Sequence, residues 1–192
     1  MPLARQTVDL LIQAAKAGCF EGDHKGLSAR EWAALRFVRR ANRFSRTPSA
    51  LADFIGTSRA TASQIVKALE AKAYVHRKTS FEDKRSVELR VTAQGEKCLN
   101  QDDPINHVVN AVAKLGTQEC VKLNFTIKEI LNHVYRELPR VQANTCLDCL
   151  FLAESNRGPR KGRAATEFMC RRYRVKVSRE ETELLCISFE RS

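Results

Sequence analysis

The alternation of apolar and polar positions along the chain predicts a mainly helical protein with one small β-hairpin. Residues 6–20 and 28–44 repeat their apolar positions with the period of an α-helix. Ser28 precedes Glu31 by three residues, which is the pattern of a capping box and marks a helix start. The apolar face of this second helix is predicted to consist of Trp32, Leu35 and Val38 (or Phe37).

Two further helices follow, and a glycine separates them. Thr47 is expected to cap the first, Pro48 to occupy its first position and Gly56 to end it. Residues 57–75 then repeat as a helix whose outward face carries Ala60, Gln64 and Lys67. Its inward face is predicted to contain Ala62, Ile65, Val66, Leu69 and Ala73. A short helix, a glycine turn and a helix with a polar outward face predict a helix-turn-helix motif.

The periodicity then changes from helical to strand-like. Residues 74–77 and 87–91 alternate apolar and polar side chains, and the charged residues 79–86 between them have the composition of a turn. Together these segments predict a β-hairpin, which in this position is a wing beside the helix-turn-helix.

Two long helical patterns follow the hairpin. The first runs from Thr92 to about Leu115 and is interrupted at residues 102–104, where a proline is expected to kink it. The second occupies residues 117–138 and ends before a proline. These helices are too apolar to stand alone, so we expect them to pack with the N-terminal helix and with a second copy of the chain as a homodimer.

The predicted fold class is therefore mainly α with a small β wing. We expect a winged helix-turn-helix at residues 28–91, a helical dimerisation region formed by residues 1–27 and 92–139, and a cysteine-rich extension at residues 140–192. No apolar run approaches the roughly 18 residues that a transmembrane helix needs. The N-terminal segment carries an acidic residue within its apolar pattern, unlike a signal peptide. We expect a cytoplasmic protein without membrane attachment.

The net charge of +11 favours a polyanionic partner, and the winged helix favours double-stranded DNA among the candidates. The second helix of such a motif enters the major groove, where Gln64 can pair with adenine and Arg59 can contact guanine or phosphate. The wing suits flanking phosphates or the minor groove. The candidate DNA-contacting residues are Thr57, Ser58, Arg59, Thr61, Ser63, Gln64 and Lys67 on the helix, with Arg77, Lys84 and Arg85 on the wing.

Residues 48–95 resemble the multiple-antibiotic-resistance regulator (MarR) family of winged-helix repressors, most clearly in 83-DKRSVELRVTAQG-95. The resemblance implies that Asp83 supports an arginine of the wing, here Arg85. Val91 stands where the family usually has leucine. The resemblance to the MarR family also implies a dimer that binds a pseudo-palindromic operator, with an inducer or redox input near the dimer helices.

The extension contains cysteines with the spacing Cys146-x2-Cys149-x20-Cys170-x15-Cys186. A close pair followed by two single cysteines is a recurring way to enclose a metal. A reducing cytosol disfavours structural disulfides between these thiols. The sequence therefore predicts a four-thiolate metal site, whereas the other three cysteines fit ordinary core positions.

The aromatic residues Phe151 and Phe189 follow the first pair and the last cysteine, as in high-potential iron–sulfur proteins and the small cluster-binding subunits of some glycyl-radical enzymes. That resemblance implies a [4Fe–4S] cluster, although the x20 spacing is longer than usual. Basic residues would then offset the cluster's charge. Structural Zn²⁺ and a thiol/disulfide switch remain alternatives. The basic residues concerned are Arg171, Arg172, Arg174 and Lys176.

These observations lead to the hypothesis of a DNA-binding transcriptional repressor whose iron–sulfur cluster senses redox state, oxygen or iron. The alternative within this class is a regulator with structural zinc and a small-molecule inducer. An RNA-binding or interaction protein, and a redox enzyme or electron carrier, are the competing classes. Catalytic residues are not predicted, because no nucleophile–base pair, phosphate-binding glycine loop or acid pair stands out.

Overall fold

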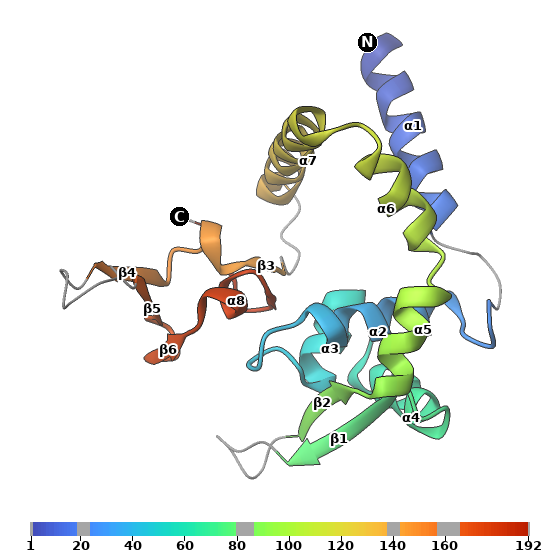
Figure 1. Cartoon of the computed structure of the whole chain (residues 1–192), viewed down its shortest axis with the longest axis vertical. Helices are drawn as coiled ribbons and strands as arrows, with labels where there is room; N and C mark the ends of the chain where they lie inside the picture. The colour runs from blue at the N-terminus through green and yellow to red at the C-terminus, as the bar shows by residue number, and fades with distance from the viewer. Residues whose placement is uncertain (1, 19–23, 80–86, 138–142, 157–165, 192) are drawn as a thin grey trace.

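The computed structural model describes residues 2–18, 24–79, 87–137, 143–156 and 166–191. Three parts are visible in Figure 1, and we call them the head (residues 27–101), the arm and the tail (residues 143–191). The head consists of α2 (Ala29–Arg40), α3 (Pro48–Ile55), α4 (Arg59–Ala71), β1 (Val75–Thr79), β2 (Val87–Val91) and α5 (Ala93–Gln101). The arm consists of α1 (Pro2–Gly18), α6 (Ile105–Ala113) and α7 (Thr117–Glu137).

The head is held together by one hydrophobic core. Each helix contributes one apolar face, and β1 and β2 close the core from the side with one residue each. Burying such side chains stabilises a fold by roughly 1.5–3 kcal/mol each, which makes this core the main source of the head's stability. The largest fully buried apolar side chains are Leu27, Trp32, Leu35, Phe37, Leu51, Leu69 and Leu89.

The helix starts in the head follow the predicted local signals. Ser28 and Glu31 form the capping box of α2, and Thr47 accepts a hydrogen bond from the amide of Ala50 at the start of α3. Gly56 ends α3 with φ of 64°, a left-handed conformation that favours glycine. The helix-turn-helix prediction is therefore confirmed in its elements.

Two helix ends differ from the prediction. The pattern through residue 44 predicted a longer helix, but α2 ends at Arg40 and Ala41 is extended. The backbone amide of Asn42 instead donates to Leu185 in the tail. Ala73 is exposed rather than on the inward face of α4, because α4 ends at Ala71 and Ala73 adopts φ of 57°.

The predicted hairpin is confirmed as the antiparallel pair β1–β2, with Val75 opposite Val91 and Thr79 opposite Val87. Thr92 caps α5, and the first turn of this helix lies against Tyr74, the residue before β1. A Cβ atom on Gly95 would lie 2.3 Å from the carbonyl oxygen of Tyr74, so only glycine allows this close approach. The buried side chains of α5 belong to the head's core, although the sequence placed residues 92–139 in the dimerisation region.

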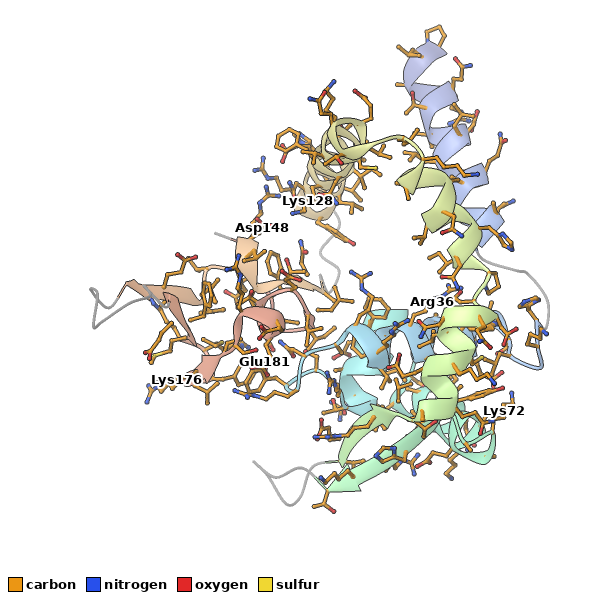
Figure 2. All side chains as sticks on the ribbon, in the orientation of Figure 1. Arg36, Lys72, Lys128, Asp148, Lys176 and Glu181 are labelled. Carbon is orange, nitrogen blue, oxygen red and sulfur yellow. The ribbon has the colours of Figure 1, made fainter. Side chains whose placement is uncertain are left out.

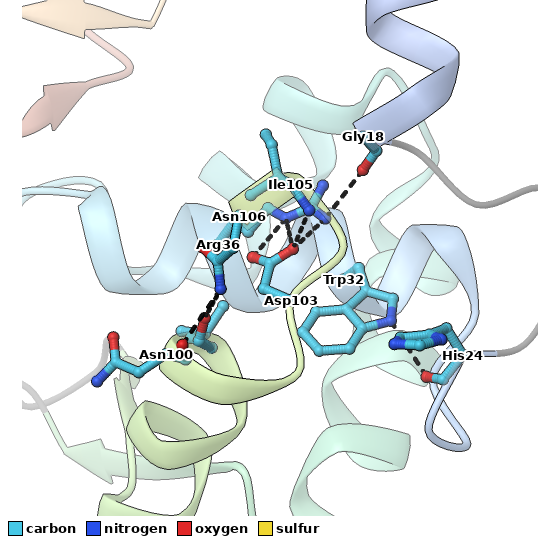
Figure 3. Close-up of polar contacts among 9 residues, drawn as sticks. Gly18, His24, Trp32, Arg36, Asn100, Asp103, Ile105 and Asn106 are labelled. Carbon is cyan, nitrogen blue, oxygen red and sulfur yellow. Dashed lines mark hydrogen bonds and ion pairs between the residues drawn. The ribbon is translucent and has the colours of Figure 1, made fainter. Parts of the chain in front are cut away.

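The helical pattern after Thr92 is broken where the proline predicted it, between α5 and α6. Asp103 lies there and forms a mostly buried ion pair with Arg36 of α2. The same guanidinium donates to the carbonyl oxygen of Gly18 at the end of α1, and Asp103 also accepts from the amide of Ile105 (Figure 3). This junction fixes the direction in which the arm leaves the head. No described helix has the length and apolarity needed to cross a membrane.

The tail is a small, irregular unit built from short elements. β3 pairs with β7, and β4, β5 and β6 form an antiparallel sheet in that order. The tail lies beside the α2–α3 loop (residues 41–47) and also reaches α7, where Lys128 and Asp148 form an ion pair of 2.8 Å (Figure 2). Its elements are β3 (Asn144–Thr145), η1 (Cys146–Asp148), β4 (Leu152–Asn156), β5 (Thr166–Cys170), β6 (Val175–Val177), α8 (Arg179–Thr182) and β7 (Leu185–Cys186).

Candidate nucleic-acid interface and thiol cavity

Helix α4 presents a polar face to solvent at the edge of the head. Its apolar residues are buried at one-turn intervals, which leaves Arg59, Gln64 and Lys67 exposed. Thr57, Thr61 and Ser63 are partly exposed on the same side of the motif. Ser58 caps the helix, and its hydroxyl accepts from the amide of Thr61. This face offers a bidentate amide, two cations and several hydroxyl groups to a ligand.

The wing strand β1 continues this polar surface. Arg77 and Lys78 are exposed on β1, and Arg77 forms an ion pair of 3.4 Å with Glu70 of α4. That pair connects the wing to the helix and holds the guanidinium near the predicted interface. The predicted wing-tip residues Asp83, Lys84 and Arg85 lie outside the described residues.

The arm exposes apolar side chains that the single chain does not cover. Phe125 on α7 is 65% exposed and Val121 is 64% exposed, and α1 shows a similar surface. Exposed apolar area of this extent on three neighbouring helices is typical of a protein–protein interface. The exposed apolar residues of the arm include Leu3, Val8, Leu10, Leu11, Ile12, Val109, Leu115, Val121, Phe125, Ile130, Leu131 and Val134.

The tail brings its four cysteines together from three elements. The tight turn of η1 places Cys149 after Cys146, and its amide donates to the carbonyl oxygen of Cys146. Asn144 pairs with Cys186 across β3–β7, which brings the last cysteine to the first. Leu152 pairs with Cys170 across β4–β5, which brings the third cysteine to the second.

All four cysteines line one cavity of about 10 Å³, roughly the space of one water molecule. Each described cysteine is a free thiol. Among the described residues, however, no group of three or more His, Cys, Asp or Glu side chains has the spacing of a formed metal site. The thiols therefore share a cavity without being drawn to ligand distance around one point. Two separate strand pairings, β3–β7 and β4–β5, create the shared cavity.

The electrostatics of Cys146 reflect this convergence. Burial, with the neighbouring thiols of Cys186, Cys149 and Cys170, raises the pKa of the Cys146 thiol to about 12. Negative charge on one sulfur opposes charge on the others. A cation at their centre reverses that balance, since it stabilises all the thiolates together.

The aromatic and basic residues predicted around the cysteines divide into two groups. Phe151 and Arg172 line the thiol cavity, and the guanidinium of Arg172 lies 5.4 Å from the ring centroid of Phe151. Phe189 lines a different cavity, of about 280 Å³, between the tail and α7. The two aromatic residues named in the iron–sulfur resemblance therefore do not enclose one site.

The remaining described cysteines lie elsewhere. Cys98 is buried in the core of the head, and the Sγ atom of Cys120 donates to the carbonyl oxygen of Val112 in the arm. Cys19 lies outside the described residues.

Sequence reasoning missed the part of the head that touches the cavity. Asn42 and Phe44 of the α2–α3 loop line the cavity together with the four cysteines. The ring of Phe44 stacks on Tyr173 of the tail at 4.1 Å between centroids. The sequence signal at Phe44 was helical periodicity, which gives no indication of a partner so distant along the chain.

Comparisons with known proteins fit the geometry of the head. The sequence model of the MarR family matches residues 25–86, which is less than half of the chain. A MarR/EmrR family transcriptional regulator from Acinetobacter sp. ADP1 has a similar structure, with 22% identity, a TM-score of 0.50, and coverage of 70% of this chain and 96% of that chain. A search of curated proteins found no match.

Two further structures show the same pattern of coverage. A MarR transcriptional regulator from Methanosarcina mazei Go1 is 12% identical, with a TM-score of 0.50 and coverage of 72% of this chain and 100% of that chain. Transcriptional regulator Tm0710 from Thermotoga maritima is 20% identical, with a TM-score of 0.48 and coverage of 72% and 98%. At 12% identity the likeness to the Methanosarcina mazei regulator concerns the fold, and more than a quarter of this chain has no counterpart in that structure.

Proposed function

We propose that this chain, whose residues 25–86 match the MarR family, is a DNA-binding transcriptional regulator rather than an enzyme. The observation that carries the proposal is the exposed polar face of α4, with the wing strand beside it on the same core. The N-terminal half of α4 presents the donors and acceptors that base edges in the major groove can pair with. The proposal places the protein with chromosomal DNA in the cytoplasm, acting as a repressor.

The second part of the proposal is a homodimer formed through the arm. The exposed apolar side chains of α1, α6 and α7 need a partner, and a second copy supplies a matching surface by two-fold symmetry. A dimer presents two α4 helices, which suits a pseudo-palindromic operator. Phe125→Glu would place a charge in this surface, so we expect monomers in sedimentation equilibrium and loss of operator binding.

The third part of the proposal is a metal centre held by Cys146, Cys149, Cys170 and Cys186. Their convergence on one cavity supports it. An iron–sulfur cluster would make the protein a sensor of redox state, oxygen or iron, whereas zinc would be structural and leave signalling to an inducer. A disulfide switch would use the same thiols without metal.

The DNA-binding proposal is tested by selecting duplexes from a randomised pool with the purified full chain. We expect an enriched, two-fold symmetric sequence that binds with an affinity falling steeply as salt rises. Single-stranded RNA of the same length is the competitor that separates the two polyanions. An absence of enrichment, or RNA that competes as well as the selected duplex, would show that the proposal is wrong.

A further inference from the structure

We propose that the four cysteines bind a single tetrahedral zinc ion, and that this ion keeps the tail attached to the α2–α3 loop of the head. The inference rests on the proposed function, because it assigns the tail a regulatory contact with the DNA-binding part. Zinc in such a site forms four bonds to sulfur, and the thiol protons leave to solvent.

Four cysteine sulfurs are a donor set of structural zinc sites, in which each sulfur lies about 2.3 Å from the ion. The strand pairings that bring Cys170 and Cys186 to the cavity supply the third and fourth ligands from within the tail. Binding requires the four sulfur atoms to turn inward, because among the described residues they do not surround one point at ligand distance.

The cavity is completed by the head, not by the tail alone. Asn42 and Phe44 of the α2–α3 loop line it together with the cysteines. Phe44 stacks on Tyr173, and the Tyr173 hydroxyl lies 2.8 Å from that of Ser188. The ion would therefore order tail residues that also contact the head at this cavity.

Backbone and side-chain contacts continue this attachment on both sides of Cys186. The amide of Asn42 donates to the carbonyl oxygen of Leu185 at 2.8 Å, and the amide of Ile187 donates to the hydroxyl of Ser45 at 2.9 Å. Leu185 and Ile187 also pack against the core of the head. A ligand of the proposed ion thus lies between two residues that hydrogen-bond to the loop.

Arg43 adds a polar contact outside the cavity lining. Its guanidinium donates to the carbonyl oxygen of Lys176 at 2.7 Å and forms an ion pair of 3.3 Å with Glu181 of α8. Because Arg43 does not line the thiol cavity, its contacts can be removed while all four cysteines remain.

The same loop is connected to both parts of the DNA-binding surface. Thr47 caps α3, the first helix of the motif. The carbonyl oxygen of Arg46 accepts from the amide of Leu89, and its guanidinium forms an ion pair of 3.7 Å with Glu88 on wing strand β2. Attachment of the tail therefore limits the movement of α3 and the wing relative to each other. We expect the zinc-loaded protein to bind DNA more tightly than the zinc-free protein.

The metal assignment is tested by elemental analysis and visible spectroscopy of the anaerobically purified full chain. We expect one zinc per chain, no absorbance from iron, and loss of zinc in Cys146→Ser and Cys170→Ser. Cys120→Ser is the matched control, because Cys120 lies in the arm, and it should keep its zinc. Stoichiometric iron with inorganic sulfide, or four thiols without metal, would overturn the single-ion assignment.

The attachment is tested by hydrogen exchange at the amides of Asn42 and Ile187. Removing zinc with a chelator should speed exchange at both and weaken binding to the selected duplex roughly tenfold. Arg43→Ala should keep its zinc, but exchange at both amides should be faster and binding to the duplex weaker, as after chelation. Arg40→Ala, which removes an equally charged, exposed side chain from α2, is the control.

The outcomes separate this inference from the proposed function. If Arg43→Ala and Arg40→Ala gave the same amide exchange and the same affinity for the duplex, the attachment would not regulate the head. The same conclusion would follow if chelation left both measurements unchanged. If the pool yielded no preferred duplex, the DNA-binding proposal would fail, while metal content and amide exchange would still support or overturn the zinc-dependent attachment.

Discussion

The head and the tail are stabilised in different ways. The head buries a continuous set of aliphatic and aromatic side chains contributed by four helices and two strands. Among the described tail residues, the buried side chains are few, and two of them are cysteines of the thiol cavity. The buried residues of the tail are Cys146, Val177, Thr182, Cys186 and Phe189.

This difference indicates why the cysteines are concentrated in the tail. A unit of this size exposes too much surface to be held by a hydrophobic core alone, and natural proteins add metals or cross-links in such cases. The head needs no such addition. The two parts should therefore respond separately to metal removal and to changes in apolar packing.

The largest expected effect is the loss of tail structure on metal removal. Structural zinc contributes on the order of 10 kcal/mol of apparent binding free energy in small domains. The proposed ion would therefore be a major source of stability for the tail, which buries few side chains. We expect fast exchange at the amide of Leu150, which now donates to the carbonyl oxygen of Glu190, after chelation. The amides of α2 should stay protected. Equal loss of protection in both parts would contradict separate stabilisation.

A substitution in the core of the head should have the opposite pattern. Leu69→Ala removes a fully buried side chain, so we expect a loss of about 2–5 kcal/mol in the free energy of unfolding. Denaturant titration followed by the fluorescence of Trp32 measures this loss. At 25 °C the variant should keep its full metal content. A proportional fall in bound zinc would mean that the two parts fold as one unit.

Substitutions on α4 should separate sequence preference from affinity. Gln64→Ala should relax the preference at one base pair by about 1–3 kcal/mol, because it removes a bidentate partner. Lys67→Ala should weaken binding to all duplex sequences equally, and it should reduce the slope of log affinity against log salt concentration by about 1. Both effects should persist after chelation, since they belong to the head. The measurement is anisotropy with matched and mutated duplexes, and an unchanged preference in Gln64→Ala would remove this residue from the interface.

The smallest expected effect concerns the pH dependence of the head. Burial raises the pKa of the Glu31 carboxyl, but hydrogen bonds from Lys72 and from the Ser28 amide and hydroxyl lower it more, so it lies below its ordinary value of 4.5. A pKa lowered by folding stabilises the protein above the unfolded-state pKa, and that stability is lost as pH falls through the folded-state pKa.

We therefore expect the melting temperature of the head to fall on acidification below about pH 5, and to fall less in Glu31→Gln. Thermal melts of both proteins between neutral and acidic pH test this expectation. If the melting temperatures of both proteins fell equally with pH, Glu31 would not contribute to the acid sensitivity of the head.

The sequence predicted the head well because its signals are local. Ser28 with Glu31, Thr47 with Pro48, and Gly56 mark helix boundaries within a few residues of themselves. Ala73 was placed wrongly because apolar periodicity continues past the true end of α4, where backbone conformation and not side-chain polarity decides.

The candidate sites were predicted unevenly for the same reason. Cysteine spacing indicated four residues that the structure brings to one cavity. The contact between Ser45 and Ile187 joins residues 142 positions apart and uses a backbone amide, which every residue except proline carries. No residue pattern announces such a contact. The attachment of the tail to the α2–α3 loop therefore required the structure.

The most direct test of the central claim is hydrogen exchange of the full, metal-loaded chain with and without its selected duplex. The claim is that the head binds DNA through α4, while the tail contacts the head and α7 and does not contact the DNA. DNA should slow exchange most in the first turns of α4 and around Arg77. The change at the tail amides should be smaller, because DNA affects them only through the attachment to the α2–α3 loop. Protection confined to the tail or to α7, with α4 unaffected, would contradict the account.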